Sequence, residues 1–146
     1  LHANTGGLQI DYRVGEPDAA LHDGESFDVV LLLEVVEHVD DVQAFVRDAV
    51  AHLAPGGLLL VSTINRTLRS YLAAIFGAEV VFRMLPRGTH RWAQFVRPKE
   101  LEQATAACGL APGERRGMAY LPAVHRAWWT RSLSVNYIAS FGKPCA

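Results

Sequence analysis

The chain has 146 residues, of which half are hydrophobic and a fifth are charged, and its formal net charge is −1. This is the composition of an ordinary globular domain; it contains no apolar run of 18 residues that could span a bilayer, and its near-neutral charge argues against a nucleic-acid-binding protein. The two cysteines, Cys108 and Cys145, lack metal-ligand spacing and fit a reducing compartment better than a disulfide scaffold.

Short apolar runs alternate with helical patterns along the chain, which predicts an α/β fold with a mainly parallel sheet. The alternating run at 8–12 predicts a first strand. The nearly continuous apolar run at 27–33 predicts a central strand that is buried on both faces. Asp40 and Asp41 then precede apolar positions at helical spacing, so we expect a helix that the proline and glycines of 54–57 bring to an end.

The second half of the chain continues the alternation. Residues 58–63 predict a second buried strand. A helix is expected over 98–108, because it begins with a proline in its first turn and is followed by Gly109. Weaker strand patterns follow near 114–120 and 136–142.

A group of ionisable residues follows the most apolar strand. Glu34, Glu37 and His38 lie just after it, and in open α/β sheets ligands bind outside the carboxyl ends of the strands. In a helical turn Glu34 would lie near the other two, and together they could bind a divalent cation such as Mg²⁺. His38 could alternatively act as a general base. A third interpretation is that the acids only stabilise the N-terminus of the next helix.

Several segments resemble known methyltransferases. The strand that ends in E-x-x-E-H, followed by a helix and an A-P-G-G turn, resembles class I methyltransferases. Other segments are similar to the ubiquinone-biosynthesis O-methyltransferases, and this resemblance extends from about residue 8 to 140. They are S-T-I-N-R at 62–66, G-A-E at 77–79, R-M-L-P-R-G-T-H at 83–90 and V-N-Y at 135–137.

This resemblance implies a reaction and a set of site residues. It implies methyl transfer from S-adenosylmethionine to a ring hydroxyl of a polyprenylated catechol or demethylubiquinol. Glu34, Glu37 and His38 would be ligands of a divalent cation, with Glu37 and His38 as the catalytic residues. Leu33 would contact S-adenosylmethionine, and Gly15 or Glu16 would contact its base.

The resemblance also implies that part of the family's fold precedes this chain. The glycine-rich turn after a first strand, and the acidic residue that ends a second strand, have no counterpart here. We therefore expect a partial Rossmann-like sheet that lacks its first two strands, with residues 1–146 as the C-terminal part of one domain. Roughly 80–100 further N-terminal residues are expected from the size of such domains, and the chain alone is expected to be inactive.

The segment 66–97 carries six arginines and one acid, Glu79, around an apolar stretch. This pattern predicts an amphipathic helical insertion that lies on an anionic membrane surface. The alternative is a lid helix that packs its apolar face over the active site. The resemblance favours the membrane, because the family's substrate carries a polyprenyl tail. Within the insertion, we expect His90 to belong to a loop near the mouth of the site.

Three aromatic residues near the C-terminus, Tyr120, Trp128 and Trp129, could line a quinol pocket, form an interfacial surface or pack in the core.

Other enzymes of ubiquinone biosynthesis are expected partners. The expected location is the cytoplasmic face of a bacterial inner membrane, or the mitochondrial matrix side. Two other functions remain open from the sequence: a non-catalytic membrane-associated subunit, and a methyltransferase for another small phenol.

Overall fold

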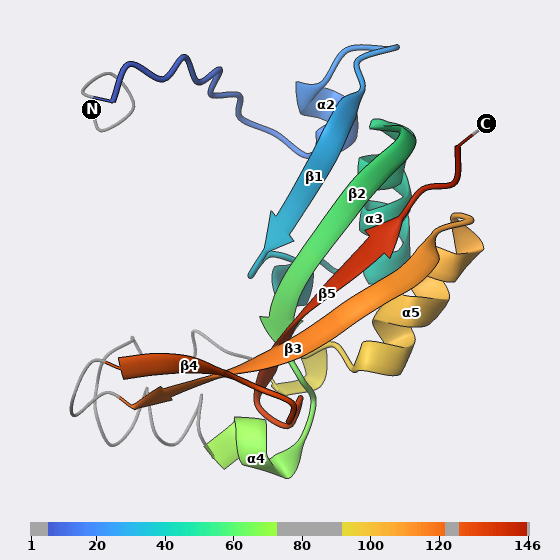
Figure 1. The fold of residues 1–146 in the computed structure, drawn as a ribbon. Coiled ribbons are helices and arrows are strands. Elements are labelled where there is room, and N and C mark those ends of the chain that lie inside the picture. Colours follow the sequence, from blue (N-terminus) through green and yellow to red (C-terminus); the bar gives the residue numbers. More distant parts are fainter. Residues whose placement is uncertain (1–5, 73–91, 122–125, 146) are drawn as a thin grey trace.

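A computed structural model describes residues 6–72, 92–121 and 126–145. Its five strands form one sheet in the order β1-β2-β5-β3-β4 (Figure 1). The strands are β1 (Phe27–Leu33), β2 (Leu53–Ile64), β3 (Ala111–Leu121), β4 (Arg126–Thr130) and β5 (Asn136–Gly142). The helices are α2 (Pro17–Ala20), α3 (Val42–Ala51), α4 (Leu68–Ser70) and α5 (Pro98–Ala107), with 3₁₀ turns η1 (Val36–His38) and η3 (Trp92–Gln94).

The α/β fold is confirmed, but the described sheet is not mainly parallel. Only β1 and β2 pair in parallel, because α3 connects them as a crossover. The pairs β2–β5, β5–β3 and β3–β4 are antiparallel. A short link joins β3 to β4, and a link of this length connects neighbouring strands only when they run antiparallel.

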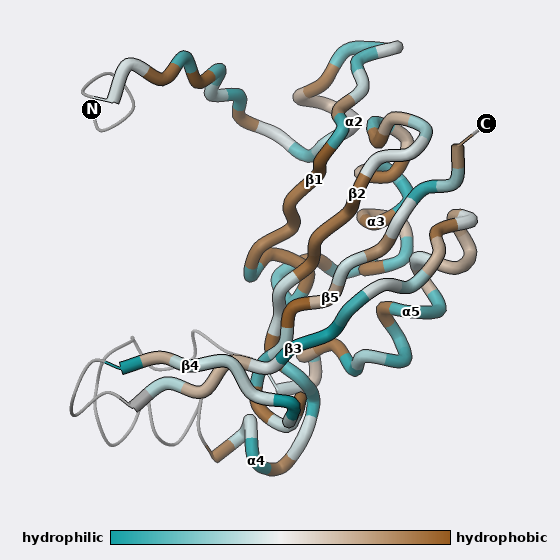
Figure 2. The backbone as a smooth tube through the Cα atoms, in the orientation of Figure 1, coloured by the Kyte–Doolittle hydropathy of each residue, from teal (hydrophilic) through white to brown (hydrophobic). Residues whose placement is uncertain are grey.

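The core lies between the sheet and the helices α3 and α5, which cover one of its faces (Figure 1). Strand β5 alternates between buried and half-buried residues, so its buried side chains are those that face these helices. Strands β1 and β2 lie side by side and are the most apolar part of the sheet (Figure 2). The largest fully buried side chains of the core are Tyr137, Phe95, Phe141, Leu53, Leu59 and Leu101.

The other face of the sheet is largely open in the part of the chain that the structure describes. Its apolar side chains Val29, Leu31 and Leu33 are about half exposed. Strand β1 is also an edge strand, since its only partner in the described sheet is β2. A long apolar edge with one open face is normally covered by further chain or by a partner.

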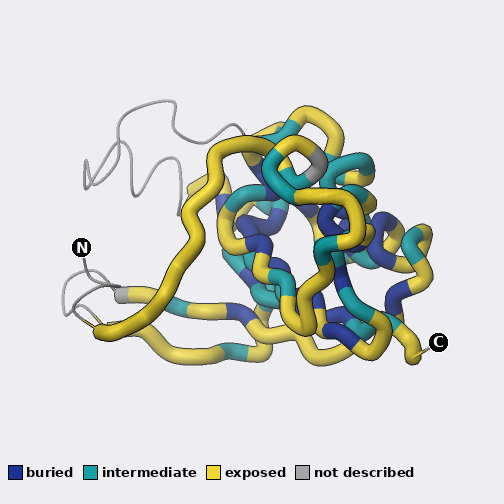
Figure 3. The backbone as a smooth tube through the Cα atoms, turned by 90° about the horizontal axis from the view of Figure 1, so that it is seen from above, coloured by how far each residue is buried: buried dark blue, intermediate teal, exposed yellow. Residues whose placement is uncertain are grey.

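The predicted strand at 8–12 is wrong. Residues 8–14 have no regular secondary structure, and the side chains of Leu8, Ile10 and Tyr12 are about half to three-quarters exposed. Figure 3 shows this N-terminal coil exposed along its length. An alternating pattern forms a strand only beside another strand, and no described strand lies next to this segment.

The helix predicted after Asp40 and Asp41 is confirmed as α3. Asp41 is its N-cap and accepts a hydrogen bond from the backbone N–H of Ala44 at 3.0 Å. The helix ends at Ala51, earlier than expected, and 54–57 form an irregularity inside β2. There Phe27 pairs with Leu53 and Val29 with Leu58, so four residues bulge opposite one.

The helix predicted over 98–108 is confirmed as α5. At its N-terminus the Glu100 carboxylate accepts a hydrogen bond from the backbone N–H of Arg97 at 3.0 Å. Gly109 follows the helix with a φ of +76°, and its N–H donates to the carbonyl of Ala106. Leu110 donates to Thr105, which completes a Schellman motif, as the glycine predicted.

The strands predicted near 114–120 and 136–142 are confirmed as β3 and β5, whereas β4 was not predicted. Strand β3 changes partner along its length: its first half pairs with β5, and its second half with β4. The change occurs at Gly117, where a Cβ atom would lie only 2.0 Å from the carbonyl oxygen of Ser132. Only glycine permits this approach.

Most of the predicted insertion, residues 73–91, and with it His90, lies outside the described residues. The amphipathic helix expected there stays a prediction. In the described ranges no helix is long and apolar enough to cross a membrane.

Two adjacent leucines of β2 test the location of the core. Leu59 is fully buried, whereas Leu58 is 38% exposed on the opposite face. We expect Leu59→Ala to lower the free energy of unfolding by about 3 kcal/mol, because it leaves a cavity. Leu58→Ala should cost less than about 1 kcal/mol. Urea denaturation monitored by circular dichroism measures both, and equal losses would contradict the assignment of the buried face.

Candidate functional site

The chain reverses direction sharply at the carboxyl end of β1. Glu34 follows the strand with a φ of +52° and is the only non-glycine residue with positive φ in the described ranges. Its N–H donates to the carbonyl of Ser62 at 3.0 Å, which extends the β1–β2 ladder by one residue. The left-handed conformation costs a non-glycine residue about 1 kcal/mol, and such residues cluster at functional sites.

Two hydroxyl groups at the end of β2 bind the two acids that follow β1. The hydroxyl of Ser62 donates to the Glu34 carboxylate at 2.6 Å, and the hydroxyl of Thr63 donates to that of Glu37 at 2.6 Å. The second pair is buried: Thr63 is 0% exposed and Glu37 is 3% exposed. Because an unsatisfied polar group is costly there, the Thr63 bond fixes the position of Glu37.

In the turn η1, the side chains of the predicted site residues Glu37 and His38 point in different directions. Val36 and Glu37 point into the protein, whereas His38 is exposed. The described residues include no group of three His, Cys, Asp or Glu side chains placed to hold a metal ion. The predicted ligand set of Glu34, Glu37 and His38 is therefore not assembled here. The reason is that Glu34 lies outside the turn, in a left-handed conformation, and not in the helical turn that was expected.

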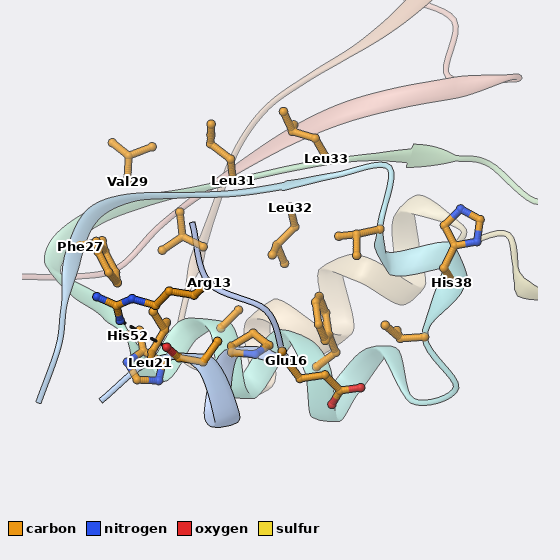
Figure 4. Close-up of a pocket in the computed structure, with 18 of the residues that line it drawn as sticks. Arg13, Glu16, Leu21, Phe27, Val29, Leu31, Leu32, Leu33, His38 and His52 are labelled. Atoms are coloured by element: carbon orange, nitrogen blue, oxygen red, sulfur yellow. Dashed lines mark hydrogen bonds between the residues drawn. The ribbon is translucent and has the colours of Figure 1, made fainter. Parts of the chain in front are cut away.

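A pocket of about 870 Å³ is lined by four of the predicted site residues. It extends around β1, because Figure 4 shows the side chain of Leu33 on one side of this strand and Glu16 on the other. Gly15 and Glu16 come from the N-terminal coil, Leu33 from the end of β1, and His38 from η1. The remaining walls are mainly apolar side chains of β1 and α3. Glu34 and Glu37 are among the described residues but do not line this pocket. Its size and apolar walls are suitable for a cofactor-sized ligand.

The coil that carries Gly15 and Glu16 is held in place by Arg13. Its guanidinium donates to both carboxylate oxygens of Glu25, at 2.6 and 2.8 Å, and to Asp11 at 2.8 Å. Glu25 lies shortly before β1, so the bidentate pair ties the coil to the start of that strand. These hydrogen bonds lower the pKa of Glu25 to about 2.

Both ends of the insertion meet beside this site, at the carboxyl end of β2. Arg66 donates to the carbonyl of Ala93 at 3.0 Å, and the indole of Trp92 donates to the carbonyl of Thr67 at 3.1 Å. Val96 N–H donates to Ile64 at 3.1 Å. The insertion thus leaves and re-enters the fold at one place, next to the residues that bind Glu34 and Glu37.

Arg13, Ser62 and Thr63 support the candidate site through their hydrogen bonds, and sequence reasoning missed all three. Ser62 and Thr63 belong to a segment that supported the resemblance, but they received no role. A usable signal was present, because the carboxyl ends of two parallel strands are adjacent and hydroxyls at one end can reach acids at the other. For Arg13 the sequence offers no comparable signal, since its partner Glu25 is twelve residues away in irregular chain.

Comparison with known proteins identifies related sequences. A family model described as a methyltransferase domain matches residues 3–113. A relative from Chelativorans sp. (strain BNC1), named ubiquinone biosynthesis O-methyltransferase, is 47% identical over 146 residues. This alignment covers 100% of the chain and 58% of the relative, so the chain spans little more than half the length of that protein.

Solved structures share the fold at low sequence identity. An O-methyltransferase family protein from Burkholderia thailandensis has a TM-score of 0.63 at 19% identity, over 99% of this chain and 39% of that one. The [4+2]-cyclase SpnF has a TM-score of 0.64 at 14% identity, over 99% and 60%. Because a protein called a cyclase shares the fold, the fold alone does not define the reaction.

The buried hydroxyl–carboxylate pair gives a stability prediction. We expect Thr63→Val to lower the free energy of unfolding by about 2–3 kcal/mol, because the buried carboxyl group of Glu37 loses its donor. Ser62→Ala is the matched control on the exposed pair, and should cost less than about 1 kcal/mol. Chemical denaturation measures both variants. A larger loss for Ser62→Ala than for Thr63→Val would contradict the assigned burial.

The Arg13–Glu25 pair predicts a dependence on pH. The folded pKa of Glu25 is below its ordinary value of 4.5, so the pair stabilises the coil above pH 4.5, and this contribution is lost as the pH falls towards about 2. The amide resonance of Gly15, followed by NMR, should shift over this range. Arg13→Gln should move the midpoint of this shift up towards 4.5, whereas Arg47→Gln, on exposed α3 surface, should leave the midpoint unchanged. An unchanged midpoint in Arg13→Gln would contradict the pairing.

Proposed function

Because the chain belongs to the methyltransferase-domain family, we propose that it carries part of the active site of an S-adenosylmethionine-dependent O-methyltransferase. The observation that carries the proposal is the placement of Leu33 and His38 at the carboxyl end of β1, in one pocket with Gly15 and Glu16. The name of a relative that is 47% identical along the whole chain supports the same chemistry. In open α/β sheets, ligands bind outside the carboxyl ends of the strands, and Leu33 and His38 lie at such an end.

The acceptor that we propose is a ring hydroxyl of a polyprenylated catechol or demethylubiquinol. The support is the name of the relative, which refers to ubiquinone biosynthesis. A phenolic ring fits a pocket whose walls are mainly apolar. Another small phenol is the alternative acceptor, and comparison of methylation rates with and without a prenyl chain distinguishes the two.

When bound, S-adenosylmethionine supplies a methyl group attached to a positively charged sulfur. Gly15 and Glu16 on one side of β1, and Leu33 on the other, would contact this cofactor around the edge of the strand and present the methyl group to the acceptor. In the transfer, a bond forms between the acceptor oxygen and the methyl carbon, while the bond between carbon and sulfur breaks. The protein mainly contributes alignment, because in-line displacement depends on geometry.

His38 is the residue that we propose as the general base. A phenol attacks well only after it loses its proton, and an imidazole can accept that proton near neutral pH. The exposed side chain of His38 lines the pocket and can reach a ligand there. Glu37, in contrast, is a positioning residue, since its carboxylate is buried against Thr63 and holds the turn that presents His38.

The predicted divalent cation does not enter this mechanism. Glu34 and Glu37 each accept a hydroxyl hydrogen bond, and the three candidate ligands do not form a metal-binding group in the described residues. Mg²⁺ bound by Glu34, Glu37 and His38 stays a prediction of the family resemblance, and no step above depends on it.

We further propose that the protein works at the surface of an anionic membrane, where a polyprenylated acceptor resides. The arginines of 66–97 support this, because cations at a membrane surface gain about 1 kcal/mol each. The two ends of this segment lie beside the proposed site, so a membrane-bound insertion would hold the pocket near its substrate. Other enzymes of the same pathway are proposed partners, and the cytoplasmic face of the inner membrane, or the mitochondrial matrix side, is the proposed location.

Substitution of His38 tests the mechanism in the full-length protein. His38→Asn should lower kcat by about 100-fold or more, because it removes the general base. The Kd for S-adenosylmethionine, measured by calorimetry, should stay within about threefold. His22→Asn is the control, since His22 is exposed and does not line the pocket. A His38→Asn protein with unchanged kcat would refute the role of His38.

A further inference from the structure

The second half of β3 and the whole of β4 form a two-stranded ribbon that extends beyond the main sheet (Figure 1). Residues Gly117 to Leu121 pair with Arg126 to Thr130, and no third strand of the described sheet continues on the far side of β4. A two-stranded ribbon buries little of its own surface. Much of the surface of this ribbon therefore lies outside the described core.

Large apolar side chains occupy both faces of this ribbon. Trp128 is 50% exposed and Trp129 is 65% exposed, and neighbouring residues of a strand point to opposite faces. Met118 lies directly across from Trp129, and Tyr120 lies on the same face as Met118. Both of these side chains are also more than 40% exposed. Such a concentration of exposed aromatic surface marks an interaction site.

Arginines outnumber acids around these aromatic residues, although Glu114 lines one surface hollow together with Arg116 and Trp129. Arg126 and Arg131 lie at the ends of β4, and both are exposed. After Glu114 the sequence contains no aspartate or glutamate, so the ribbon carries no acidic side chain. An interaction partner of this surface must therefore supply negative charge together with apolar contact.

From this combination we propose that the β3–β4 ribbon binds the interfacial layer of an anionic phospholipid bilayer. Tryptophan and tyrosine favour the headgroup level of a bilayer, where the ring is partly apolar and its polar atom remains hydrated. Arginines beside them gain from anionic headgroups. A second copy of the ribbon would instead bring like charges together. A folded protein partner would cover one face, whereas here both faces are apolar.

This surface is distinct from the membrane contact proposed for 66–97, and it does not depend on the methyl-transfer chemistry. Its residues come from the C-terminal part of the chain, after α5. The inference can therefore fail while the proposed O-methyltransferase activity stands, and the reverse is also true.

Sedimentation with vesicles tests the proposal. The protein should bind vesicles of equal parts phosphatidylglycerol and phosphatidylcholine, and bind pure phosphatidylcholine at least tenfold more weakly. Trp128→Ser/Trp129→Ser should reduce binding by about tenfold. Arg126→Gln/Arg131→Gln should reduce it by about 30-fold, because it removes two arginines that each contribute about 1 kcal/mol at an anionic surface. Tyr12→Ser and Arg47→Gln are matched controls on exposed surface elsewhere, and should bind as the unmodified protein does.

Fluorescence provides a second measurement that does not depend on the stability of these variants. The chain has three tryptophans, so Trp92→Phe leaves only the ribbon pair as emitters. Their emission should shift to the blue on addition of anionic vesicles and be quenched by brominated lipid. The proposal would be overturned if the protein did not bind the vesicles or if the emission spectrum did not change. Equal binding by Trp128→Ser/Trp129→Ser would also overturn it, and would assign the membrane contact to another part of the chain.

Discussion

Two hydroxyl–carboxylate hydrogen bonds join the carboxyl ends of the only parallel strand pair in the described sheet. Ser62 binds Glu34 and Thr63 binds Glu37, so the turn after β1 is built on the end of β2. The buried Glu37 cannot rotate outwards without leaving its donor, and this fixes the next residue, His38, at the pocket. The position of the proposed base therefore depends on a strand that does not itself line the pocket.

The sequence predicts the helices and strands whose apolar residues recur at a clear helical or strand spacing. The runs that became β1, β2, α3 and α5 carry continuous apolar stretches or helical spacing, with acids, proline and glycine at their ends. The run at 8–12 has an equally clear alternation but is not a strand, because strand formation also requires a neighbour. The short β4 escaped notice because both of its central tryptophans stay exposed, which removes the alternation that identifies a half-buried strand.

The site was predicted in part for a similar reason. Spacing placed His38 at the strand end, and the family resemblance named Leu33, Gly15 and Glu16; all four line the pocket, and their roles stay predictions. Spacing could not show that Glu34 adopts a left-handed conformation, because this strained backbone is stabilised by hydrogen bonds with Ser62 of another strand. The expected grouping of Glu34 with Glu37 and His38 assumed a regular helical turn.

Gly117 has a mechanical consequence for the whole molecule. At this residue β3 passes from β5 to β4, and the Ser132 carbonyl occupies the space of an absent side chain. The strand therefore continues from the main sheet into the ribbon without a loop. The direction in which the ribbon leaves the sheet depends on this one close approach, which a methyl group at residue 117 would prevent.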